Sequence, residues 1–327
     1  MVDTDYNDSI SRTNAGPLIN EEVVGEIIKE VPLNSTVLQM MRRLPNASKK
    51  QVRVPVLNSL ATAYFVAGEG GDTPGTLTDG QKKTTKIEWA NKYIYIEEIA
   101  AIVPVAQQII DDSDYDIWAE VKPSIVEAMG ATIDAAILFG TDKPSTWPGG
   151  IVTDAIAKSM TVTETEDLYK DIFEPAGMLD LVRKMGYFPT GFIAGMGMEA
   201  KLDGIRDTLG RPIFDNYQQQ ENQYRLKGKP LITDALGTMD AGAASASMIA
   251  GAWNKAVYCI RQDISFDIAT EASLFDNTGT LQYNLFQQDM VALRCVMRLG
   301  WQIPNPINRI KKNAALQYPF SVLVPAT

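Results

Sequence analysis

A stripe of apolar residues, one at every fourth position, runs through the middle of the chain and predicts a long helix with one face in the core. Side chains four residues apart lie on the same face of an α-helix. The stripe consists of Ile117, Val121, Ile125, Met129, Ile133 and Ile137. We therefore expect a helix over residues 114–139, with other elements laid along it.

Both ends of this predicted helix are marked in the sequence. Asp112, Ser113, Asp114 and Asp116 stand where the first amides of a helix lack partners, and acidic or hydroxyl side chains are favoured there. Gly140 stands where a left-handed residue commonly ends a helix. Inside the helix, Pro123 removes one hydrogen bond, so we expect a kink or a restart at that residue.

Two runs that alternate apolar and polar residues predict a β-hairpin with a long tip. Residues 49–57 and 86–96 have the two-residue period of strands, and the segment 68–80 between them is rich in glycine. Long loops in compact domains commonly serve binding. Because a two-stranded ribbon is only marginally stable alone in water, we expect the hairpin to lie against a neighbouring molecule.

Shorter patterns predict the remaining elements. A polar arm over 1–19 precedes an expected helix from Asn20 to Pro32, and a short helical piece over 35–44 follows. The expected helix has one apolar face, formed by Val23, Val24, Ile27 and Ile28, so it must pack on something else. Further along, the patterns predict a helix over 164–186 broken at 175, a strand at 192–194, a helix over 198–209, a polar loop over 210–230, and strands at 247–250, 256–261, 264–269 and within 284–303.

Composition narrows the function classes. The 327 residues are 45% hydrophobic, enough for a substantial core, and the formal net charge of -10 argues against a protein that grips DNA or an anionic membrane. Histidine is absent, which excludes nucleophiles paired with histidine and metal sites that need imidazole. Cys259 and Cys295 fit no metal-binding spacing, and we expect both to be reduced core residues. No membrane span, signal peptide or cofactor is expected.

Five stretches are informative through their order. They are the stretch Tyr-Phe-Val-Ala-Gly-Glu-Gly at 64–70, a helix entry at 107–113, a glycine-bounded exit at 140–151, the pair 210–213 and 226–231, and a closing strand at 289–300. Together they resemble the major capsid proteins of tailed bacteriophages, which have the Hong Kong 97-like fold. The resemblance covers roughly 240 residues, and each motif alone is weak.

The resemblance implies an α+β capsid fold with four parts. These are an N-terminal arm over 1–48, an extended β-hairpin loop over 49–97, a peripheral domain over 98–150 and 285–327 with the spine helix 114–139, and an axial domain over 151–284. It also implies a structural protein, not an enzyme, that self-assembles into the icosahedral head of a tailed double-stranded DNA phage. Its location would be the virion, after assembly in the host cytoplasm.

The same resemblance implies the partners. The first is the chain itself, in pentamers and hexamers of a shell. The others are a portal, a decoration protein and packaged DNA held by non-specific confinement, with no membrane. Residues 1–48 are too short for the fused scaffolding region that some members carry, so a separate scaffold protein, or none, is implied.

Charge is distributed unevenly along the chain. Residues 97–121 hold seven acids and no base, whereas residues 42–53 hold five bases and no acid. We hypothesise that a basic set on the arm or hairpin docks on the acidic helix entry of a neighbouring subunit; the alternative is that each set is only a solvated face. The candidate contact residues are Arg42, Arg43, Lys49, Lys50, Arg53, Glu69, Lys82, Lys83, Lys86, Asp111, Asp112, Asp114, Asp116 and Glu120.

Four alternatives stay open at this point. An encapsulin-like compartment with an enzyme cargo has the same fold. Residues 195–200 fit a dinucleotide fingerprint with Asp215 twenty residues on, although no return to a parallel strand is evident after the expected helix. The carboxylates near residue 112 could form an acid-base pair, but helix capping explains them more simply. Some members of the family form Lys–Asn cross-links, for which Lys82 or Lys83 is placed suitably, but no partner asparagine can be matched.

Overall fold

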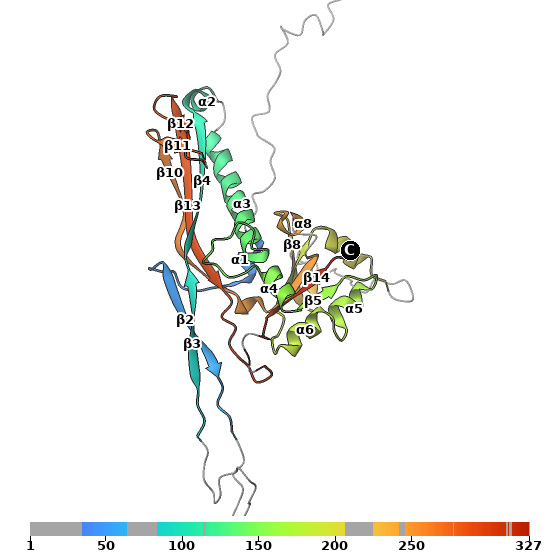
Figure 1. The fold of residues 1–327 in the computed structure, drawn as a ribbon. Helices are drawn as coiled ribbons and strands as arrows, with labels where there is room; N and C mark the ends of the chain where they lie inside the picture. The colour runs from blue at the N-terminus through green and yellow to red at the C-terminus, as the bar shows by residue number, and fades with distance from the viewer. Residues whose placement is uncertain are drawn as a thin grey trace, which may run out of the picture.

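The computed structural model describes residues 35–63, 84–113, 116–206, 225–241, 246–276, 278–311, 313 and 316–326. Three parts stand out in Figure 1. A long, narrow sheet has one long helix along it, a compact sheet flanked by short helices lies to one side, and a two-stranded hairpin projects beyond the long sheet.

The long sheet has four strands in the order β1-β10-β13-β4. Its strands are β1 (Arg42–Arg43), β4 (Glu97–Ala106), β10 (Val257–Ala269) and β13 (Met290–Gln302). The prediction of two strands at 256–261 and 264–269 is wrong in one respect, because β10 is a single strand with register shifts around Gln262. At its far end, β11 (Ser273–Phe275) and β12 (Leu281–Asn284) form a small separate hairpin.

The predicted long helix is α3 (Ile117–Leu138), preceded by the separate helix α2 (Gln107–Asp112). Asp116 caps α3, since its carboxylate accepts from the backbone N–H groups of Trp118 and Ala119 at 3.1 and 3.2 Å. The helix runs without interruption through Pro123, so the expected restart does not occur. The predicted stripe is half-buried near Ile117 and fully buried from Ile125 onward, where α3 reaches the body of the molecule.

The glycines at both ends of the turn after α3 are required by the backbone. Gly140 has φ of +75°, the left-handed conformation predicted from its position. Gly150 packs so closely on this turn that a Cβ there would lie 2.5 Å from the backbone N of Gly140 and from the carbonyl carbon of Phe139. The chain therefore reverses in a tight, side-chain-free contact and continues into α4 (Ile151–Ala157).

The compact sheet has six strands in the order β5-β14-β9-β6-β8-β7. Its strands are β5 (Thr161–Thr163), β6 (Gly191–Gly195), β7 (Arg225–Leu226), β8 (Lys229–Asp234), β9 (Met248–Gly251) and β14 (Phe320–Val324). The helices around it are α4, α5 (Leu168–Phe173), α6 (Met178–Lys184), α7 (Gly197–Asp203), α8 (Thr238–Ala241) and the 3-10 turn η2 (Trp253–Lys255). The predicted break of 164–186 at Pro175 is confirmed, because α5 and α6 are separate helices.

Alternate residues of the central strands face two different cores. Ile193 and Ile249 join the main core, which also contains the C-terminal half of α3 and the inner face of the long sheet. Phe192 and Met248 join a second core that is closed by α5 and α7. Since the main core is shared, the two sheets form one packed body. Cys259 and Cys295 are buried and free, as predicted.

The short helix α1 (Thr36–Met40) is held on α3 by a buried carboxylate. Asp134 is fully buried, and its two oxygens accept from Ser35 Oγ and from the backbone N–H of Thr36 at 2.5 and 2.8 Å. Burial is the main cause that raises the pKa of Asp134 to about 7, and the nearby charge of Asp234 adds to it. The start of the described chain is thus fixed on the long helix.

Strand pairing divides the chain differently from the expected domain boundaries. β10 lies within the expected axial range 151–284 but pairs with β1 and β13 in the long sheet. β14 lies within the expected peripheral range 285–327 but pairs with β9 and β5 in the six-stranded sheet. The expected loop over 210–230 is wrong at its end, because β7 and the first residues of β8 form a short hairpin around Lys227 and Gly228.

Candidate assembly surfaces

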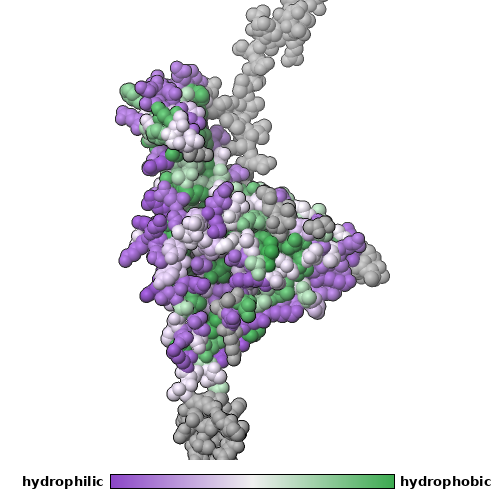
Figure 2. Space-filling view, in the orientation of Figure 1, coloured by the Kyte–Doolittle hydropathy of each residue, from purple (hydrophilic) through white to green (hydrophobic). Residues whose placement is uncertain are grey.

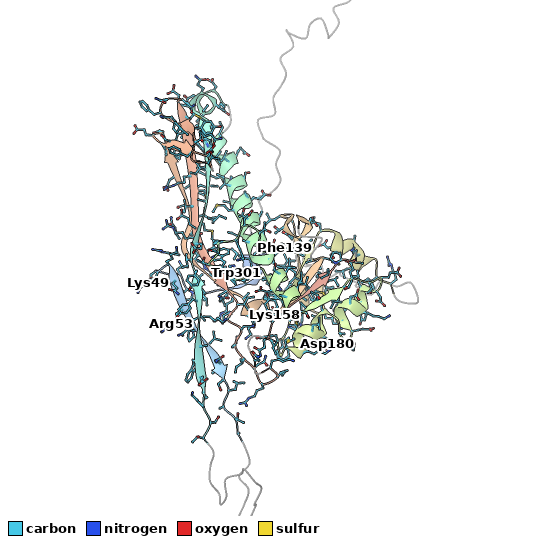
Figure 3. All side chains as sticks on the ribbon, viewed as in Figure 1. Lys49, Arg53, Phe139, Lys158, Asp180 and Trp301 are labelled. Atoms are coloured by element: carbon cyan, nitrogen blue, oxygen red, sulfur yellow. The ribbon has the colours of Figure 1, made fainter. Side chains whose placement is uncertain are left out.

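The projecting hairpin consists of β2 (Gln51–Ser59) and β3 (Glu88–Tyr95), which pair antiparallel as predicted. Lys49 and Arg53 are exposed at its base and lie, in Figure 3, on the side of the molecule away from the six-stranded sheet. Lys50 is exposed, with its Nζ 3.7 Å from Glu97 Oε2. Exposed pairs of this kind contribute little to stability, so these bases remain available to a partner.

The remaining basic candidates fall in three places. Arg42 and Arg43 form β1 at the edge of the long sheet, where both side chains are exposed and Arg43 donates to Asn46 Oδ1 at 3.1 Å. Lys86 pairs with Glu88, and this hydrogen bond raises the pKa of the Lys86 ammonium. The basic candidates Lys82 and Lys83 lie outside the described residues, and so does the acidic candidate Glu69.

The acidic candidates lie around the start of α3. Asp111 and Asp112 are exposed on α2, and Gln107 Nε2 donates to Asp111 Oδ1 at 3.0 Å. Asp116 is exposed and caps α3, whereas Glu120 is half-buried in its first turn. Asp114 lies outside the described residues. Capping therefore explains Asp116, and the exposed carboxylates of α2 form the accessible part of this acidic set.

The basic and acidic sets lie at opposite ends of the long sheet (Figure 1). Glu97, which neighbours Lys50, begins β4, and α2 begins directly after β4 ends at Ala106. Ten residues of extended chain span roughly 30 Å, so the two sets cannot pair within one molecule. Any ion pair between them must join different copies of the chain.

One face of the hairpin carries an exposed apolar strip that the sequence analysis did not single out. The strip consists of Ile87, Trp89 and Tyr93, which are 43%, 69% and 39% exposed. The opposite face of β3 is covered, because Ile94 packs with Val257 and Cys259 of the long sheet. Period-two alternation predicted these side chains on one face of the strand, but only the packing of the other face shows that this one is free.

A second exposed apolar group lies at the opposite end of the long sheet. It gathers large side chains from α2, from the β11–β12 hairpin and from the turn before β13, each more than half exposed. These are Ile109, Phe275, Leu281 and Phe286. Large apolar side chains exposed together at one end of a molecule commonly mark a site of protein association. Both ends of the elongated sheet therefore combine charge with exposed apolar side chains.

The candidate dinucleotide fingerprint requires a correction. β6 and β8 are parallel neighbours with α7 between them in sequence, so the parallel return that the sequence analysis found missing does exist. Two carboxylates stand by this turn, however. Asp240 Oδ1 lies 3.0 Å from the point where a Cβ on Gly195 would be, and Glu199 on α7 contacts Thr233 Oγ1. Negative charge at this turn opposes a bound pyrophosphate. Asp215 lies outside the described residues.

The described part of the chain shows neither a metal centre nor a membrane helix. Within it, no group of three acidic or cysteine side chains could hold a metal ion. None of its helices is long and apolar enough to cross a membrane.

Comparison with known proteins identifies the family. The model of the phage capsid family matches residues 15–312, which is most of the chain. The chain belongs to the phage capsid family. It is therefore a structural shell protein of a phage capsid with the Hong Kong 97-like fold, and this favours the phage shell over an encapsulin-like compartment.

Individual relatives of this family agree with the assignment. The major capsid protein of Staphylococcus phage 80alpha is 26% identical over 293 residues, covering 88% of this chain and 82% of the relative. A solved structure from Microbacterium phage Oxtober96 is 31% identical with a TM-score of 0.81, covering 98% of this chain and all of the other. One from Mycobacterium phage Cain is 25% identical with a TM-score of 0.79, covering 98% and 99%.

Proposed function

We propose that this chain builds the icosahedral head of a tailed double-stranded DNA phage, by self-assembly into pentamers and hexamers and without catalysing a reaction. The observation that carries the proposal is the apolar strip on the β2–β3 hairpin. A ribbon of two strands is marginally stable alone, and Trp89 is 69% exposed near the end of β3 that is farther from the long sheet. Covering this strip with a neighbouring subunit stabilises the ribbon and joins the two copies.

The charge distribution indicates which ends of two neighbouring subunits meet. The hairpin base is basic and the α2 end is acidic, at least the length of β4 apart in one molecule. Opposite charges at the two ends favour an arrangement in which the basic end of one copy meets the acidic end of the next. We propose that such heterologous contacts close into rings, as the symmetry of a capsomer requires.

The domain roles follow from the sheets. We propose that the long sheet, with α2, α3 and the β11–β12 hairpin, is the peripheral domain, and that the six-stranded sheet with its helices is the axial domain at the capsomer centre. β10 then belongs to the peripheral domain and β14 to the axial domain, in place of the boundaries expected from sequence. The extended loop is the β2–β3 hairpin with its tip, and residues preceding α1 are the arm.

The proposed partners beyond the chain itself follow the family. They are a portal, a separate scaffold protein and a decoration protein. The head is assembled in the host cytoplasm and is then part of the virion. The net charge of -10 suits a wall that confines DNA without binding it tightly.

The substitution Trp89→Lys tests whether the apolar strip on the β2–β3 hairpin is a contact between subunits. It places a charge in the strip, so the shell contact should be lost while the subunit, whose core does not contain Trp89, keeps its stability. Negative-stain electron microscopy should show no shells for Trp89→Lys and normal shells for the matched control Trp89→Phe. Both variants should keep the urea midpoint of the parent chain. Normal shells from Trp89→Lys would overturn the proposal.

The charge contact has its own test. Reversal of Lys49, Lys50 and Arg53 to glutamate should block assembly without unfolding the subunit, because the hairpin base would then repel an acidic neighbour. Additional reversal of Asp111 and Asp112 to lysine should restore assembly in part. Normal shells from the triple variant would show that these bases are only a solvated face.

A further inference from the structure

A groove opens on the body of the molecule where three helices meet. It encloses about 730 Å³ between the C-terminal half of α3, the start of α4 and the β8–α8 connection. Its apolar lining consists of Ala131, Ala135, Phe139, Val152, Ile156 and Leu236. Hydrophobic surface gathers in this region of the face seen in Figure 2, and Figure 3 labels Phe139 there. Ile156 is 46% exposed on the groove wall, so apolar surface is left uncovered.

The groove also contains an unsatisfied polar atom. Thr238 is 6% exposed, and its hydroxyl is one of two buried side-chain polar atoms without a hydrogen-bond partner in the described part of the chain. A buried hydroxyl without a partner costs free energy, commonly about 1–3 kcal/mol. Because this hydroxyl is enclosed by the subunit itself, an occupant of the groove does not change that cost.

The point where the described chain begins lies beside this groove. Ser35 and Thr36 are hydrogen-bonded to Asp134 on α3. Asp134 lies on the same helical turn as the groove residues Ala131 and Ala135, next to them around the helix. Ser35, the first described residue, is therefore held on α3 within one helical turn of these groove residues.

The preceding sequence has the composition that this groove fits. Residues 20–31 are predicted to form a helix with one apolar face, which includes Val24, Ile27 and Ile28, and Pro32 ends it. Three residues of extended chain between Pro32 and Ser35 reach roughly 10 Å. The C-terminal end of that helix is thus restricted to the neighbourhood of the groove by its own covalent connection.

We propose that residues 20–31 dock as an amphipathic helix in the groove between α3, α4 and α8 of their own chain. The small side chains of Ala131 and Ala135 allow close approach of a helix backbone, and Val24, Ile27 and Ile28 cover the wall at Ile156. The arm before residue 20 then starts from a fixed point on the subunit surface.

Disulfide trapping in the full-length chain tests the docking. Ile27→Cys combined with Ala135→Cys should form a disulfide within one chain, seen as a faster monomer band on a non-reducing gel. Lys29→Cys with Ala135→Cys is the matched control, since residue 29 lies on the opposite face of the predicted helix, and it should react at least tenfold more slowly. The native cysteines are buried and do not compete.

Two results would overturn the docking. Equal oxidation of both pairs would show that the predicted apolar face does not point into the groove. A disulfide between mixed chains that carry Ile27→Cys and Ala135→Cys separately, without one inside a doubly substituted chain, would assign the groove to the arm of a second copy.

Limited proteolysis provides a measurement that needs no engineered cysteine. Ile156→Glu places a charge on the groove wall, and tryptic cleavage after Lys29 should then become at least tenfold faster than in the parent chain. Ile310→Glu, at a residue that is 64% exposed outside the groove, should leave cleavage unchanged. Unchanged cleavage in Ile156→Glu would overturn the proposal, whatever the effect on shell assembly.

Discussion

Replacing Asp134 with asparagine removes a titrating group from the core while keeping its shape. The carboxylate is fully buried, and the nearby buried carboxylate of Asp234 raises its pKa further. No compensating base bears on it in the described part of the chain. Asparagine can still accept from the backbone N–H of Thr36 through its Oδ1, so α1 should stay docked on α3.

The magnitude follows from linkage. The pKa of Asp134 is about 7 in the folded chain and 3.8 in the unfolded chain. Between these values the folded state binds more protons, so the contribution of Asp134 to the free energy of unfolding is greatest below pH 3.8 and is lost as the pH rises through 7. At 1.36 kcal/mol for each pKa unit, the full loss contributed by this residue is about 4 kcal/mol.

Urea unfolding of the unassembled full-length chain, followed by tryptophan fluorescence between pH 4.5 and 8.5, measures this loss. The parent chain should lose stability across the range, and Asp134→Asn should lose about 3 kcal/mol less, because the range begins above pH 3.8. Asp203→Asn, an exposed substitution on α7, should leave the parent pH dependence unchanged. If Asp134→Asn kept the parent pH dependence, the carboxylate would not be the titrating group and the argument from its burial would be wrong.

Three further predictions concern local contacts. Gly150→Ala should destabilise the subunit by about 3 kcal/mol or more, because the added Cβ would lie 2.5 Å from fixed backbone. The loss should be seen as insoluble protein or a lowered urea midpoint, and a soluble subunit with the parent midpoint would contradict the prediction. Arg298→Ala removes the cross-strand pair with Glu98, whose side chains are 40% and 47% exposed, and should change the urea-derived stability by less than about 1 kcal/mol. Boiled, reduced particles should run as one band near 35.9 kDa if Lys82 and Lys83 form no cross-link, whereas a ladder would reveal one.

Several elements were predictable because local patterns and tertiary packing agree. The four-residue stripe predicted α3, and the two-residue period predicted β3 and the closing strand β13. The cap at Asp116 and the left-handed stop at Gly140 were also predictable, since both depend on neighbouring backbone groups only.

Other elements were missed where the local signal opposed the final structure. β4 begins with Glu97 and Glu98 and contains Pro104, a composition that disfavours a strand, but it lies at the edge of its sheet, where proline is tolerated. β8 begins with Lys229 and Pro230 and was predicted to be loop at that point. Its parallel pairing with β6 joins positions far apart in the chain, which no local pattern reports.

The sequence by itself determined the helical and extended segments, the charge imbalance between residues 42–53 and 97–121, and, through the order of five motifs, the capsid family. These depend on side-chain periodicity and composition, which are properties of short stretches. Only the tertiary structure decided that β10 belongs to the four-stranded sheet and β14 to the six-stranded sheet. It also decided that Trp89 stays exposed while Ile94 is buried, and that a groove lies beside Ser35. Those features arise from contacts between distant segments, because burial is decided by what packs against a face and not by the residues on it.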